Sequence, residues 1–161
     1  MDVRFGVHAG LQHTSIAELR DLWARIETLG FDWISIWDHF YAADATGDPH
    51  CLEAVAAHAA LAATTERVTC GSLVYSAGYR HPAVLAKMAA TLDVVSNGRL
   101  ELGLGWGSVP DELQTFGFGA EPAARRSARL RETLEILAAM FTGEPFDHEG
   151  ELFTLRGARG R

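Results

Sequence analysis

An aspartate and a histidine stand side by side where a predicted strand ends. Asp38 and His39 follow residues 32–37, a short run rich in β-branched and aromatic side chains that predicts a strand. A carboxylate beside an imidazole at the end of a strand can orient a substrate or move a proton. The alternative is that Asp38 caps the following turn and His39 is merely exposed. These two residues are the candidates for catalysis.

A second candidate stretch lies at the end of the next predicted strand. It consists of Gly71, Ser72, Leu73 and Val74. The small residues Gly71 and Ser72 allow the backbone to approach a flat ligand closely. A simple exit from the strand explains the same residues equally well.

A third stretch, residues 103–108, contains three alternating glycines. It superficially suggests the dinucleotide fingerprint GxGxxG, but its sixth position is Ser108, and Val109 and Pro110 follow in place of a helix start. The failed match argues against a dinucleotide-binding site here. Gly105, Trp106, Gly107 and Ser108 instead indicate a loop that leaves room for a large planar group.

Strand alternation in this region predicts two faces. The leucines at positions 100, 102 and 104 would pack under helices, and Glu101, Gly103 and Gly105 would face the other side. Close packing between strands, or a tight turn, is the alternative reason for these glycines.

Composition excludes several classes of partner and site. The chain has 161 residues, 48% of them hydrophobic, and a net charge of −7, which argues against nucleic acid and anionic membranes as partners. No HxH, HExxH or paired CxxC motif is present, so we expect no metal site. No apolar run approaches the roughly 20 residues that span a bilayer, and the first residues lack the features of a signal peptide. A cytoplasmic protein is expected.

One basic cluster is predicted to be a solvated helix face. It comprises Arg125, Arg126, Arg129 and Arg131, beside Glu132 and Glu135. Ion pairs three and four residues apart would then satisfy its charges.

The elements that must position these residues alternate between strand and helix. Strands are expected at residues 3–8, 32–37, 68–74 and 99–104. Helices are expected after a capping box of Ser15 and Glu18, at about 51–64, from Pro82 to Asn97–Gly98, and at about 123–141. A hairpin at 144–155 and a frayed end at 156–161 complete the chain.

Four consecutive strand–helix pairs predict an α/β fold with a parallel sheet. Either a four-stranded doubly wound sheet or half of an eightfold barrel fits this order. A closed barrel needs about 250 residues, so the second alternative would leave open strand edges, which invite pairing with another chain.

Four segments resemble the luciferase-like monooxygenase superfamily, and in particular its flavin- or F420-dependent oxidoreductases. They are GFDWISIWDHF (30–40), RVTCGSLVYSAGYRHPAVLAKMAATLDVVSNGRLELGLGWG (67–107), ELQTFG (112–117) and RLRETLEILAAMFTGEPFDHEGELFTL (129–155). The resemblance implies one luciferase-like domain over residues 1–161, forming the amino-terminal half of a TIM-type (β/α)₈ barrel with about four β/α units.

The resemblance also implies a cofactor, F420 in preference to FMN, at the carboxyl ends of the strands. Asp38 and His39 match a pair that lies beside the cofactor, with the histidine as the base that takes a proton from a small-molecule substrate. A non-proline cis peptide is implied at Ser72–Leu73. Ser108 departs from the family because the sugar-oxidising F420 branch has a glutamate there; Asp111 or Glu112 could substitute.

The missing second half implies either a homo-oligomer or a separate carboxyl-terminal half. The alternative to an oxidoreductase is a non-catalytic truncated half-barrel that associates with itself or with another chain.

Overall fold

The computed structural model describes residues 3–42, 50–107, 109–119 and 121–160. The chain divides into two compact units, one of Met1–Tyr75 with Leu92–Gly103 and one of Ser76–Thr91 with Leu104–Arg161. Each unit is described by itself. The single domain over residues 1–161 stays a prediction.

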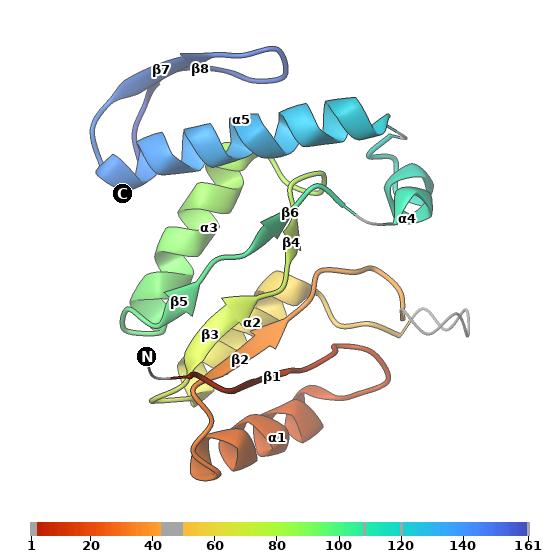
Figure 1. Cartoon of the computed structure of the whole chain (residues 1–161), viewed down its shortest axis with the longest axis vertical. Coiled ribbons are helices and arrows are strands. Elements are labelled where there is room, and N and C mark those ends of the chain that lie inside the picture. The colour runs from red at the N-terminus through yellow and green to blue at the C-terminus, as the bar shows by residue number, and fades with distance from the viewer. Residues whose placement is uncertain (1–2, 43–49, 108, 120, 161) are drawn as a thin grey trace. The chain divides into compact units, whose positions relative to one another are not determined.

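The first unit is built on a four-stranded parallel sheet in the order β1-β2-β3-β5 (Figure 1). Its strands are β1 (Gly6–His8), β2 (Trp33–Ile36), β3 (Thr69–Ser72) and β5 (Leu100–Glu101). Helix α1 (Ile16–Thr28) connects β1 to β2, and helix α2 (Ala54–Thr64) connects β2 to β3. The α/β alternation and the parallel sheet predicted from the sequence are confirmed, with shorter strands than expected.

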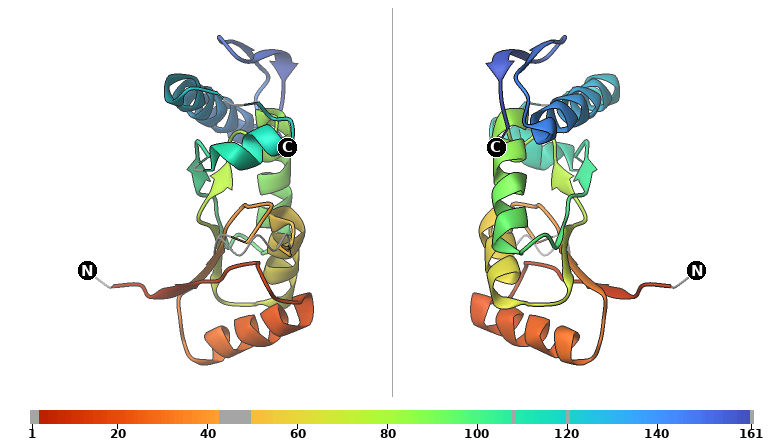
Figure 2. Two further views of the ribbon diagram at one scale, coloured as in Figure 1. Left: turned by 90° about the vertical axis from the view of Figure 1, so that its right-hand side faces the viewer. Right: turned by 90° about the vertical axis from the view of Figure 1, so that its left-hand side faces the viewer.

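Alternation along the strands of the first unit divides the sheet into two faces. Ile34, Ile36 and Cys70 are fully buried and alternate with Ser35 and Gly71, which point to the other face. The buried side chains of Trp23 and Leu61 supply the helical part of the same core. The two side views of Figure 2 show α1 and α2 beside the sheet.

Helix α1 begins as the sequence predicts. The Ser15 hydroxyl accepts from the backbone N–H of Glu18, and the Glu18 carboxylate accepts from the backbone N–H of Ser15. This capping box satisfies amide groups that have no partner within the helix.

Arg99, at the start of β5, ties together three parts of the first unit. Its guanidinium donates to the carbonyl oxygens of Ala62 and Thr65 at the end of α2, and to the carbonyl of Val68 before β3. It also contacts the Thr65 hydroxyl and the Cys70 thiol. A guanidinium suits this place because the last carbonyls of a helix have no partner within it and attract a cation.

The strand predicted at residues 99–104 is interrupted, which corrects the sequence analysis. β5 ends at Glu101 and β6 (Leu104–Gly105) begins three residues later, paired with β4 (Tyr75–Ser76). The Ser72 hydroxyl accepts from Gly103 N at 3.0 Å and donates to Gly103 O at 2.9 Å. The Ser72 side chain thus takes the place of a backbone acceptor for Gly103 N, while Gly103 O also accepts from Tyr75 N at 2.9 Å, and the pairing of β3 with β5 does not extend to Gly103.

The remaining elements are three helices and a hairpin. They are α3 (Pro82–Val95), α4 (Pro110–Thr115), α5 (Ala123–Thr142), β7 (Phe146–Glu149) and β8 (Thr154–Ala158). The stop at Asn97–Gly98 is confirmed, because both residues have positive φ. Helix α4 begins at Pro110, so the expectation that no helix starts there was wrong; proline suits the first turn of a helix. Residues 156–158 belong to β8 and are not a frayed end, because the hairpin pairs Ala158 with Phe146.

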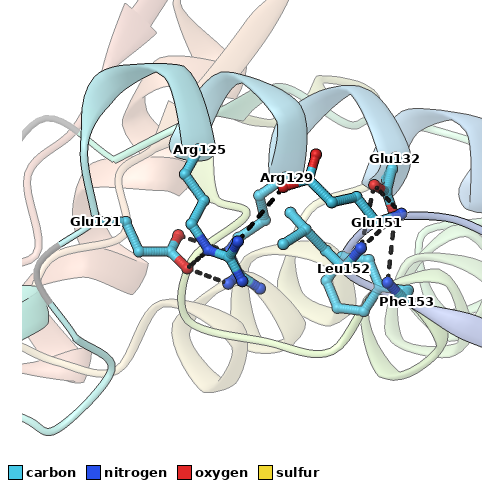
Figure 3. Close-up of polar contacts among 7 residues, drawn as sticks. All are labelled: Glu121, Arg125, Arg129, Glu132, Glu151, Leu152 and Phe153. Atoms are coloured by element: carbon cyan, nitrogen blue, oxygen red, sulfur yellow. Dashed lines mark hydrogen bonds and ion pairs between the residues drawn. The ribbon is translucent and has the colours of Figure 1, made fainter.

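A buried carboxylate joins the hairpin to α5 in the second unit (Figure 3). Glu132, on α5, is 3% exposed and accepts from the backbone N–H groups of Glu151, Leu152 and Phe153 at 3.0–3.2 Å. Burial raises the pKa of Glu132, but these amides and His148 outweigh it and hold the pKa below the ordinary value of a glutamate.

The basic cluster on α5 is only partly a solvated face. Arg131 pairs with Glu135 four residues away, as predicted. Arg125 also has a partner at the predicted spacing, since it pairs with Glu121 four residues away, although Glu121 precedes the helix. Arg129 binds the same carboxylate from eight residues away (Figure 3). Arg126 contacts a glycine loop described below.

Among the described residues, no helix is both long and apolar enough to span a membrane.

We predict that Arg99→Ala destabilises the protein by about 2–4 kcal/mol, because three carbonyls lose their donor at once. Arg4→Ala is the matched control: Arg4 pairs with Glu101 through side chains that are each about half exposed. Exposed pairs contribute about 0–1 kcal/mol. Urea unfolding of both variants measures the difference, and equal losses would contradict the assigned role of Arg99.

We predict that Glu132 stabilises the folded protein at neutral pH and that this contribution is lost in acid. Because its pKa is lowered on folding, the contribution is present above the ordinary pKa and disappears as the pH falls through the lower, folded value. The free energy of unfolding of Glu132→Gln should therefore lie about 1–3 kcal/mol below wild type at pH 7. The two values should converge below about pH 4. Parallel pH curves for the two proteins would refute this.

Candidate functional site

Two neighbouring parallel strands bring the predicted catalytic pair and the Gly71–Val74 stretch to the same edge of the sheet. Ile36, the last residue of β2, lies beside Ser72, the last residue of β3. Leu73 N then donates to Ile36 O at 2.7 Å. Asp38 and His39 follow β2 after one residue, Trp37, so they leave the sheet at this same carboxyl edge, where α/β proteins bind ligands.

Asp38 and His39 differ in their exposure. Asp38 is 7% exposed, whereas His39 is partly exposed. The His39 ring stands edge-on to the indole of Trp37, with ring centres 5.3 Å apart and planes at 85°. An edge-to-face contact of this kind favours one ring orientation.

A hollow of about 430 Å³ lies on the face of the sheet opposite Ile34 and Cys70. It is lined by Trp33, Ser35, Gly71, Ser72, Leu73, Glu101, Leu102 and Gly103. Its volume is in the range of small-molecule sites. Leu102 and Gly103 both line it, so the strict alternation predicted for this strand was wrong; the interruption after Glu101 breaks the pattern.

The two glycines of the hollow have different roles. A side-chain carbon at Gly71 would lie 3.4 Å from Ser35 Cβ, 3.5 Å from Ile34 O and 3.8 Å from Glu101 O, all of them ordinary contacts. A side-chain carbon at Gly103 would lie 2.2 Å from Ser72 O, which is impossible without a backbone shift. Gly71 therefore leaves room for a ligand, whereas Gly103 is required for packing between strands, the alternative reason noted above.

A non-proline cis peptide is present, but one residue later than predicted. It joins Leu73 to Val74, and Ser72–Leu73 was the wrong bond. The physical reason is that Leu73 N still donates to Ile36 O. The Ser72–Leu73 peptide thus continues the sheet ladder, and the chain leaves the ladder only after Leu73.

The other predicted cofactor residues belong to the second unit. Trp106 is 44% exposed, and the Arg126 guanidinium lies 5.3 Å from the centre of its ring. Arg126 also donates to Gly107 O, and Gly107 has φ +85°. Arg126 thus supports the loop of Gly105, Trp106 and Gly107. Ser108 lies outside the described residues.

Arg126 is a residue whose role the sequence analysis missed. Its partner is a carbonyl oxygen 19 residues away, and spacing along the helix holds no signal for that contact. Glu112, named as a substitute acid, is 3% exposed and accepts from Tyr79 OH at 2.6 Å.

Among the described residues, no three His, Cys, Asp or Glu side chains gather closely enough to hold a metal ion.

Comparison with protein families gives one match over nearly the whole chain. The model of the family described as luciferase-like monooxygenase matches residues 3–161. Among curated relatives, the F420-dependent glucose-6-phosphate dehydrogenase of Rhodococcus erythropolis is 34% identical over 159 residues, covering 98% of this chain and 47% of the relative. That of Microbacterium testaceum is 34% identical over 157 residues, covering 97% and 46%. The chain thus spans about half the length of the curated relatives it matches.

Solved structures share the fold. An F420-dependent secondary alcohol dehydrogenase, in complex with an F420–acetone adduct, superposes with a TM-score of 0.89 at 23% identity, covering 99% of this chain and 48% of that one. The oxygenating constituent of 3,6-diketocamphane monooxygenase from Pseudomonas putida, in complex with FMN, gives 0.78 at 24% identity, covering 96% and 44%. These similarities support the partial barrel predicted from the sequence.

We predict that Gly71→Ala changes the free energy of unfolding by less than about 1 kcal/mol, because the added methyl meets only ordinary contacts. The free energy of unfolding of Gly103→Ala, the matched control, should fall by about 1–3 kcal/mol or more, because the added methyl overlaps a carbonyl oxygen. Urea unfolding compares the two. If Gly71→Ala were as damaging as Gly103→Ala, Gly71 would be a packing residue and not the open floor of a binding site.

Proposed function

Because the chain belongs to the luciferase-like monooxygenase family, we propose that it is part of a flavin- or F420-dependent oxidoreductase acting on a small organic substrate. Its match to about half of each relative supports an amino-terminal half-barrel. F420 is favoured over FMN because the curated relatives named above are F420-dependent dehydrogenases.

One observation carries the proposal: a hollow containing Gly71 lies on one face of the sheet, and Ser72 and Leu73, which line it, stand at the carboxyl edge from which Asp38 and His39 also leave the sheet. The hollow is lined largely by apolar surface. A flat tricyclic ring needs this kind of surface, and a side chain at Gly71 would occupy the space. The residues present therefore fit such a ring.

In this proposal Gly71, Ser72, Leu73 and Val74 would hold the ring system. The cofactor, when bound, supplies the hydride-accepting or hydride-donating centre. Loops after other strands would hold the remainder of the cofactor, with Gly105, Trp106, Gly107 and Ser108 as candidates.

His39 is the proposed base. A neutral imidazole can take a proton from a substrate hydroxyl. Trp37 restricts the orientation of the His39 ring through the edge-to-face contact. Asp38, adjacent and largely buried, would stabilise the positive charge that His39 gains.

A non-catalytic half-barrel is the second candidate, and the sheet itself favours it. β1 and β5 are the two edges of the four-stranded sheet, and Val3 and Phe5, next to β1, are 71% and 65% exposed. Unpaired edges of this kind can bind a further strand from another chain or a second copy. Size-exclusion chromatography with light scattering tests this, and a monomer at all concentrations would refute self-association.

We predict that F420 binds the chain saturably in the micromolar range and more tightly than FMN, as measured by parallel fluorescence titrations. Gly71→Val should weaken binding at least tenfold, because its side chain would occupy the hollow, and a carbon in the Cβ position meets only ordinary contacts. Absence of binding to both cofactors would refute the proposed function for this chain.

The role of His39 is tested in the same experiment. His39→Ala should bind F420 within a few-fold of wild type. F420 reduction, assayed with glucose 6-phosphate and with 2-propanol, should fall at least 100-fold wherever wild type shows turnover, as expected for a lost general base. Unchanged turnover would remove His39 from the mechanism.

A further inference from the structure

A serine and a histidine form a hydrogen-bonded pair on the sheet face that bears the hollow. Ser35, in β2, is 3% exposed and lines the hollow. His8, the last residue of β1, lies beside it in register. His8 Nδ1 and Ser35 Oγ are 2.8 Å apart. The pair links the hollow to the carboxyl edge of β1.

The imidazole of His8 is accessible as well as paired. His8 is exposed, although partial burial lowers its pKa, so the ring is neutral at neutral pH and has one donor and one acceptor nitrogen. Within the described part of the chain, only Nδ1 of this ring has a hydrogen-bond partner. Nε2 is therefore available to a ligand, as acceptor or donor according to the direction of the Ser35 bond.

Trp37 connects this pair to the proposed base. Its indole contacts the His8 ring with centres 5.9 Å apart at 80°, and the His39 ring with centres 5.3 Å apart at 85°. Gly10 makes room for the indole, because a side-chain carbon there would lie 3.2 Å from Trp37 Cζ2. The His8 and His39 rings thus both contact the indole of Trp37, close to the carboxyl ends of the adjacent strands β1 and β2.

We propose that Ser35 and His8 form a second polar subsite, which binds a hydroxyl or carbonyl oxygen of the ligand in the hollow. The inference rests on the proposed function, because it assigns a contact within the same site. The subsite adds a neutral donor–acceptor pair to the hollow of the first unit.

The chemistry of the pair matches an oxygen-bearing ligand. A serine hydroxyl donates one hydrogen bond and accepts two, and a neutral imidazole supplies one of each. Together they can satisfy a hydroxyl, which needs both functions, or a carbonyl, which needs a donor. A carboxylate or phosphate would be poorly served, because neither member is charged.

The test measures binding of F420 and of FMN to wild type, His8→Phe, His8→Gln and Ser35→Ala by fluorescence titration. His8→Phe and Ser35→Ala should lower the affinity for the probe about three- to tenfold, the effect of losing one neutral hydrogen bond. His8→Gln, which keeps a donor and an acceptor, should stay within about twofold of wild type. His81→Phe, in the second unit, is the matched control and should bind as wild type does.

Nitrogen NMR of the histidine rings adds a readout that loss of packing does not mimic. Saturation with the probe should shift the Nε2 resonance of His8, and Ser35→Ala should change the Nδ1 resonance in the free protein. Because His8 is exposed, its two variants test the proposal even where Ser35→Ala unfolds.

Wild-type affinity in His8→Phe, with no shift of Nε2 on binding, would overturn the subsite and leave the proposed function standing. Failure of wild type to bind either probe would overturn both. The two failures are therefore distinguishable.

Discussion

The first unit depends on the way Arg99 and Glu27 hold the segment that leads into β3. Arg99 donates to carbonyl oxygens at the end of α2 and at Val68. The Glu27 carboxylate, on α1, accepts from the backbone N–H groups of Glu66, Arg67 and Val68. Burial raises the pKa of Glu27, but the three amides and Arg99 together outweigh burial and hold the pKa below the ordinary value of a glutamate, so the carboxylate stays ionised. One segment thus has its carbonyls bound by a cation and its amides bound by an anion.

This constraint determines where the hollow forms. With the approach to β3 held from both sides, Cys70 lies beside Leu100 and Gly71 beside Glu101. That register places Gly71 between Ser35 and Glu101 on one face. A slip of one residue would turn every side chain to the opposite face, and the fully buried Cys70 would then replace the glycine floor. The second unit uses the same device, since Glu132 binds three successive amides of the hairpin.

Features set by local interactions could be predicted from the sequence. The Ser15 and Glu18 capping box and the positive φ of Asn97 and Gly98 involve residues close together in the chain. The break after Glu101 could not be predicted, because it depends on a hydroxyl 31 residues away. The position of the cis peptide depends in the same way on the carbonyl of Ile36.

In the candidate site, too, some residues could be predicted from the sequence and others could not. Asp38, His39 and Gly71 follow from position, since residues after parallel strands gather at one edge of the sheet. The contact of Arg126 with Gly107 and that of His8 with Ser35 join residues 19 and 27 apart. No spacing rule reports such contacts, and a lone histidine at a strand end is more often a loop residue.

The residues that form the hollow differ from those proposed to react with or bind the ligand, so substitutions in the two groups should have different effects. The hollow is lined by large side chains such as Trp33 and Leu102 as well as by small residues. The strand register that forms it depends on Arg99, far along the chain from the proposed base. Substitutions at Arg99 or Gly103 should therefore act first on the free energy of unfolding. Substitutions at His39 or His8 remove groups that the core does not need, because both rings are at least partly exposed. A variant that loses binding or turnover while its free energy of unfolding is unchanged should therefore be one at His39 or His8. The two measurements together test the role of each residue independently.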